Sequence, residues 1–148
     1  MRRLLLGVLA ALLVVAVLAA LVLSRGTFDT YPRAGLAGAG APAWTAPCRA
    51  DPGAGRDRTM CRRVAGRVVW IQKRDPDGDG DRHLIVVARL RPRIVKVPRD
   101  FPLRRLPGRG SWVDATGWVV VGASGHSEVE PRLLRTSGEV ARAPVRGR

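Results

Sequence analysis

The pattern of apolar and polar positions divides the chain into an apolar block, an irregular segment and a series of alternating segments. Residues 4–23 are all apolar or glycine, with no charge and no proline. As a helix they span about 30 Å, the thickness of a bilayer's hydrocarbon core. Because Arg2 and Arg3 precede the block, the positive-inside rule predicts a single-pass membrane helix with a cytoplasmic N-terminus and the rest of the chain outside. A cleaved signal peptide is the alternative, although its apolar region is usually shorter.

The composition changes after this block. Residues 25–47 hold several glycines together with Pro32 and Pro42, and show neither a helical nor a strand period. This predicts a flexible linker between an N-terminal unit, 1–24, and a folded domain, 48–134. The basic segment 135–148, which includes Pro144, is predicted to be a disordered tail.

The folded domain begins with the clearest pattern in the chain. Residues 62–89 read as a strand, an Asp/Gly turn and a returning strand, because β-branched and aromatic residues flank the turn. Further strands are predicted at 93–97, 112–121 and 128–133, the last as an edge strand because of Pro131. Prolines and glycines break up 99–110, which is predicted to be a loop. The fold class is therefore all-β, with one N-terminal helix.

The only two cysteines, Cys48 and Cys61, both follow the apolar block. If that block sends the chain outward, both thiols lie in an oxidising compartment, and one disulfide is the simplest prediction. Closing a loop of this size contributes on the order of 3 kcal/mol in the chain-entropy model.

Two strands carry glycine-containing motifs, Val64-x-Gly66-x-Val68 and Gly110-x-x-Val113-x-Ala115-x-Gly117-x-Val119. These motifs and the five predicted strands resemble the OB-fold, a small five-stranded barrel. The missing helix between the third and fourth strands leaves an SH3-like barrel open. The resemblance implies binding of oligonucleotides, oligosaccharides or proteins on the face of the second and third strands and on the loops after the first and fourth.

The net charge of +14 comes almost wholly from arginine, a composition typical of GC-rich bacterial genomes. The charge alone is therefore weak evidence for a nucleic-acid partner. A polyanion-binding band on the second and third strands, with tryptophans as stacking platforms, is one hypothesis. Its candidate residues are Arg89, Arg91, Arg93, Lys96, Trp70 and Trp118. A tryptophan at an alternating strand position is more often part of the barrel wall, which is the competing interpretation.

The predicted turn carries four carboxylates, those of Asp75, Asp77, Asp79 and Asp81. They would repel phosphate at a place where an OB-fold usually binds it. The first three, with Gly80, match the start of an EF-hand calcium loop, but the twelfth position is Val86 instead of glutamate. A hairpin turn kept soluble by its charge is the simpler interpretation. No cofactor is expected, although this loop is a candidate Ca²⁺ site.

No catalytic constellation stands out, and the expected protein is not an enzyme. Ser124 lacks the spacing of a nucleophile elbow. The expected function is a non-catalytic binding module of the bacterial cell envelope, anchored in the membrane with its C-terminal domain extracytoplasmic, and with an envelope protein as a candidate partner. One alternative is a binder of single-stranded nucleic acid or another polyanion. The other is a calcium-dependent OB-fold hydrolase, since the Asp77–Asp79 pair resembles that of secreted OB-fold nucleases.

Overall fold

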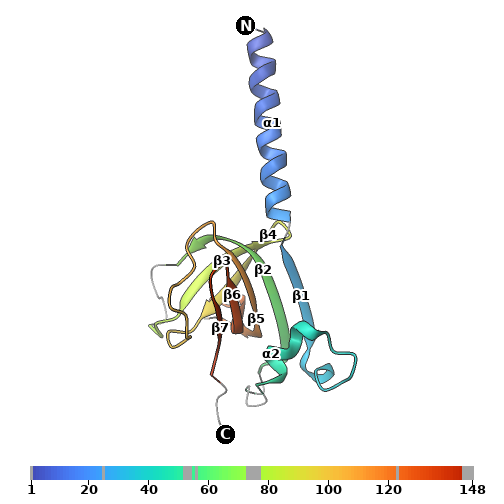
Figure 1. Cartoon of the computed structure of the whole chain (residues 1–148), viewed down its shortest axis with the longest axis vertical. Helices are drawn as coiled ribbons and strands as arrows, with labels where there is room; N and C mark the ends of the chain where they lie inside the picture. Colours follow the sequence, from blue (N-terminus) through green and yellow to red (C-terminus); the bar gives the residue numbers. More distant parts are fainter. Residues whose placement is uncertain are drawn as a thin grey trace.

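The computed structural model describes residues 2–24, 26–51, 55, 57–72, 78–122 and 124–144. A single helix, α1 (Arg2–Ser24), extends away from a β domain (Figure 1). Its described side chains, residues 7–21, are all apolar and exposed. Within the described residues, no helix combines the length and the hydropathy expected of a membrane-crossing segment.

Five strands close into a barrel. They are β2 (Met60–Ile71), β3 (Arg82–Ala88), β4 (Arg91–Val97), β5 (Trp112–Val121) and β6 (Ser127–Thr136). Antiparallel pairs join β2 to β3, β3 to β4, β5 to β6 and β2 to β5, and a parallel β4–β6 pair completes the ring. The five predicted strands are thus confirmed. The fold is mostly β, and its closed barrel is compatible with an OB-like fold.

Alternate strand residues fill the barrel. Leu84, Val86, Val95, Val113 and Leu134 are fully buried in one apolar cluster. The predicted loop between β4 and β5 closes one end of this cluster, because Phe101, Leu103 and Leu106 pack against it. These loop side chains cover apolar surface where a helix would otherwise be needed.

Two glycines allow strands to cross closely. A Cβ at Gly66 would lie 2.0 Å from the carbonyl oxygen of Val87, and one at Gly117 would lie 1.9 Å from that of Glu130. Any larger residue would therefore push β2 away from β3, or β5 away from β6. Gly66, in the first of the two glycine-containing motifs, is thus a position of close backbone approach.

The prediction of a flexible linker at 25–47 is wrong for much of that segment. It contains β1 (Thr27–Pro32), two short 3-10 helices (Arg33–Gly35 and Ala43–Thr45) and α2 (Ala46–Arg49). Because β3 pairs only with the second half of β2, the first half of β2 is free to pair with β1. Phe28 then packs against the barrel core.

The C-terminal predictions also need correction. Beyond β6, a short strand, β7 (Val140–Arg142), pairs with it and places Ala141 in the core, so the segment up to Arg142 is ordered. Residues 145–148 of the predicted tail lie outside the described part.

The prediction that β6 is an edge strand is also wrong, since β5 pairs along one side of it while β4 and β7 pair along the other. Pro131 falls in the gap between the β4 and β7 pairings, where no ladder hydrogen bond is required.

Candidate functional site

The segment between α1 and β2 folds over one outer face of the barrel as a cap. Cys48 of α2 and Cys61 of β2 form the predicted disulfide, with Cα atoms 6.2 Å apart. Trp118 lies opposite Cys61 on the face of β5 that points away from the main core, and it packs with the disulfide and Leu36. The disulfide therefore fixes the cap to the barrel wall.

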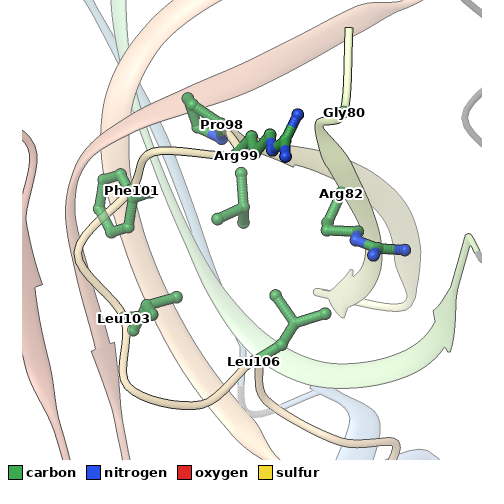
Figure 2. Close-up of a pocket in the computed structure, with 8 residues that line it drawn as sticks. Gly80, Arg82, Pro98, Arg99, Phe101, Leu103 and Leu106 are labelled. Carbon is green, nitrogen blue, oxygen red and sulfur yellow. The ribbon is translucent and has the colours of Figure 1, made fainter. Parts of the chain in front are cut away.

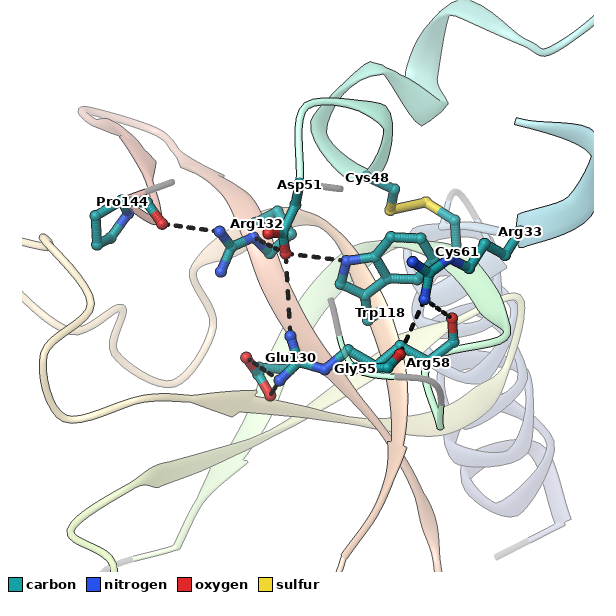
Figure 3. Close-up of polar contacts among 10 residues, drawn as sticks. All are labelled: Arg33, Cys48, Asp51, Gly55, Arg58, Cys61, Trp118, Glu130, Arg132 and Pro144. Atoms are coloured by element: carbon teal, nitrogen blue, oxygen red, sulfur yellow. Dashed lines mark hydrogen bonds and ion pairs between the residues drawn. A yellow bond between two sulfur atoms is a disulfide. The ribbon is translucent and has the colours of Figure 1, made fainter. Parts of the chain in front are cut away.

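A buried group of charges joins the cap to β5 and β6 (Figure 3). We call it the cap cluster; its residues are Asp51, Arg58, Trp118, Glu130 and Arg132. The carboxylate of Asp51, which is 3% exposed, accepts a hydrogen bond from Trp118 Nε1 at 3.2 Å and lies 3.0 Å from Arg132 Nε. Arg58 approaches the same carboxylate at 4.0 Å and contacts both carboxylate oxygens of Glu130 at 2.7 and 2.9 Å. Each charge in the cluster thus has an opposite charge nearby.

Lys96 faces the described part of the acidic segment before β3. Asp75 and Asp77 lie outside the described residues. Lys96 Nζ lies 2.6 Å from Asp79 Oδ2 and 3.3 Å from Asp81 Oδ2, while the backbone N–H of Arg99 donates to Asp81 at 3.0 Å. The hydrogen bond from Lys96 lowers the pKa of Asp79. Partial burial lowers the pKa of Lys96, but its hydrogen bonds to Asp79 and Asp81 outweigh this and raise it above its usual value.

The described residues offer little for the candidate calcium site. Asp79 and Asp81 already face the ammonium group of Lys96. Across the described ranges, no group of three or more His, Cys, Asp or Glu side chains is arranged to hold a metal ion.

The six candidate polyanion-binding residues do not share a surface. Trp118 is 1% exposed beneath the cap, so its ring cannot stack on a base. Lys96 faces the acidic segment, and Trp70, 44% exposed, lies opposite Ile85 in the middle of β3. Only three residues come together, at the turn between β3 and β4. They are Arg89 and Arg91, both exposed, and Arg93, whose guanidinium lies 3.8 Å from the ring centre of Phe28.

A cavity of about 390 Å³ opens where the β4–β5 loop closes the barrel (Figure 2). Phe101, Leu103 and Leu106 line one side of it, and Arg82 and Arg99 lie on the other. The sequence analysis missed this site because its residues lie on a proline-broken loop without a period. The signal that could have found it is the presence of three large apolar residues in that loop.

The sequence analysis also did not identify the buried pair of His83 and Glu128. His83 Nε2 lies 3.2 Å from Glu128 Oε2, and a Cβ at Gly122 would lie 2.2 Å from the glutamate's other oxygen. Within the described part of the chain, His83 Nδ1 has no hydrogen-bond partner. The two residues are only 6% and 4% exposed, so a substrate cannot reach them in this conformation.

Comparison with known proteins finds no family model and no curated protein that matches the chain.

Proposed function

We propose that this protein is a membrane-anchored binding module whose OB-like barrel lies outside the cytoplasmic membrane. The observation that carries the proposal is the Cys48–Cys61 disulfide, which joins the cap to the barrel in a chain that begins with an exposed apolar helix. Disulfides persist in oxidising compartments, which supports a barrel on the far side of a membrane that α1 would enter. Arg2 and Arg3 then stay in the cytoplasm.

The exposure of α1 supports an apolar environment for the helix. Fourteen consecutive residues, 8–21, present apolar side chains around its whole circumference. A helix that packs on a soluble domain is apolar along one stripe only. In a bilayer, by contrast, every face of such a helix is favourably solvated.

The cavity at the β4–β5 loop is the proposed ligand site. Its lining combines the apolar side chains of Phe101, Leu103 and Leu106 with two arginines, Arg82 and Arg99, which suits a ligand with an apolar group and an anionic group. Guanidinium groups stay protonated and hold anions by directed hydrogen bonds. We therefore propose binding without catalysis at this site.

Reporter fusions test the topology. A reporter fused after Arg148 should be active only if it requires the extracytoplasmic side, and α1 should resist extraction from membranes by alkaline carbonate. Activity of a reporter that works only in the cytoplasm would overturn both the orientation and the compartment inferred from the disulfide.

Calorimetric titration with naphthalene sulfonate tests the cavity in the full chain in lipid nanodiscs, with empty nanodiscs as the blank. In the double variant Arg82→Ser, Arg99→Ser, the Kd for naphthalene sulfonate should rise about tenfold for each guanidinium group removed. A hydrogen bond to a charged group is worth about 1.5–3 kcal/mol. Arg104→Ser with Arg105→Ser is the matched control, because both arginines are exposed in the same loop. Equal binding by the two double variants would show that the cavity does not select anions.

Polyanion binding is the second candidate function, favoured by the grouping of Arg89, Arg91 and Arg93 at one turn.

A further inference from the structure

The turn between β3 and β4 has an unusual backbone. Arg89 and Leu90 adopt φ angles of 49° and 62°, in the left-handed region that favours glycine and asparagine. Both residues and the following Arg91 and Pro92 are exposed, and Leu90 is 58% exposed. The turn thus presents a large apolar side chain between arginines, in a conformation that neither Arg nor Leu favours.

This turn lies next to the end of α1. The helix contacts β3, and Gly26 packs so tightly on Ala88 that a Cβ at Gly26 would lie 2.6 Å from the Ala88 Cα. Only one residue separates Ser24 from Gly26 along the chain, and only one separates Ala88 from Leu90. These short connections keep Leu90 within about 20 Å of the helix end. Figure 1 shows the turn directly beside the base of α1.

Among the described residues, no carboxylate neutralises the arginines at the turn. In the described part of the chain, no ion pair involves Arg89, Arg91 or Arg93. Burial, and then the charge of Arg91, lower the pKa of Arg93, as expected where like charges crowd together. At the other end of the same two strands, Lys96 has two carboxylates within 3.3 Å.

We propose that the β3–β4 turn docks on anionic lipid headgroups of the membrane that α1 enters, with Arg89 and Arg91 on phosphates and Leu90 in the interfacial layer. The proposal rests on the membrane anchor of the proposed function. Basic residues near an anionic leaflet are attracted to it, and an exposed leucine gains from the interface. A soluble polyanion would use the arginines but would leave Leu90 in water. The barrel would therefore be held against the bilayer instead of turning freely on its helix.

A fluorescent label tests the docking in the full chain. An environment-sensitive dye is attached at Leu90→Cys, or at Val121→Cys as the control, in nanodiscs of phosphatidylcholine with or without phosphatidylglycerol. Both positions are exposed apolar residues, 58% and 74% exposed, and the native cysteines are joined in a disulfide. In anionic discs we expect a blue shift and protection from an aqueous quencher at position 90, and no change at position 121.

Two arginine variants test the role of charge. Arg89→Ser with Arg91→Ser should reduce the ratio of protected to unprotected label by roughly five-fold for each arginine removed. Arg104→Ser with Arg105→Ser removes the same charge from the segment beyond the other end of β4, and should leave the ratio unchanged.

The outcomes separate this proposal from the anchor on which it rests. Release of the chain by carbonate would overturn both. Retention of the chain with equal quencher access at positions 90 and 121 would overturn the docking alone. Equal protection in discs without phosphatidylglycerol would also overturn it, as would protection by a single-stranded oligonucleotide in those neutral discs.

Discussion

The cap cluster and the β3–β4 turn use arginine in opposite ways. In the cap cluster, Arg132 is 6% exposed and its Nε lies 3.0 Å from the carboxylate of Asp51. At the turn, Arg89 and Arg91 are exposed, and no described residue forms an ion pair with them. The first arrangement holds parts of the fold together, whereas the second leaves its charge available to something outside the chain.

This difference shows why net charge was a poor guide to function. Many arginines give the chain its charge of +14, but those of the cap cluster form ion pairs with carboxylates inside the structure. Lys96, a candidate for the polyanion-binding band, forms ion pairs with Asp79 and Asp81. The informative arginines are the exposed ones without a carboxylate partner.

The largest effect is expected from breaking the cap cluster. Asp51→Asn removes the negative charge that faces Arg132 and Arg58, while an amide oxygen can still accept from Trp118. Leaving a buried charge without its partner typically costs about 3–5 kcal/mol, so the free energy of unfolding should fall by about 3 kcal/mol. Denaturant unfolding followed by tryptophan fluorescence measures this.

Asp57→Asn serves as the control for that change. Asp57 is exposed and near the same cap, so its substitution should stay within about 0.5 kcal/mol of the wild type. Similar losses from both substitutions would show that the cap is not held by the Asp51 carboxylate.

An intermediate effect, of opposite sign, is expected at the β3–β4 turn. Arg89→Asn with Leu90→Gly gives residues that accept the observed φ angles of 49° and 62°. Relieving left-handed backbone strain should raise the free energy of unfolding by about 1 kcal/mol, after the larger chain entropy of glycine in the unfolded state is subtracted.

Denaturant midpoints of the full chain in detergent micelles, where no anionic lipid is present, measure this effect. Arg104→Asn, at an exposed position where φ is negative, should leave the midpoint unchanged. A loss of stability in the turn variant would mean that Arg89 or Leu90 makes a contact that the fold needs.

Much of the barrel could be predicted from the sequence because alternation records which side of a strand is buried. Val113 and Ala115 face the main core and Trp118 faces the other way, as an alternating strand requires. Alternation could not show that a cap covers that second face, so Trp118 remained a candidate stacking platform. The strand β1 was missed because six residues between glycines and prolines carry too little pattern. Its conformation is decided by pairing with β2.

The sites were harder to predict because they depend on partners that are distant in sequence. The exposed arginines at 89 and 91 were visible, but the dipeptide Arg89-Leu90 carries no turn signal that would have revealed the left-handed backbone. The cavity needs a loop folded back on the barrel end, and the neutralisation of Asp79 needs Lys96 from the next strand. In each case the interaction arises from tertiary packing and not from local spacing.

The smallest effect is expected at the Asp79–Lys96 pair, which lies between the two extremes of the comparison. The Asp79 side chain is 37% exposed and that of Lys96 17%, so solvent screens their attraction. A double-mutant cycle of Asp79→Asn and Lys96→Met should give a coupling free energy below about 1 kcal/mol at neutral pH. Because folding lowers the pKa of Asp79, this contribution is present above the unfolded pKa of about 3.9 and is lost as the pH falls through the folded value. Because folding raises the pKa of Lys96, the contribution is present below about pH 10.4 and is lost as the pH rises through the folded value.

The coupling free energy should therefore form a plateau between these two pH limits, and denaturant unfolding across pH measures it. Added Ca²⁺ should not raise the Tm of the wild type. A calcium-dependent rise that Asp79→Asn abolishes would instead show that the ion displaces Lys96, and would support the hydrolase hypothesis.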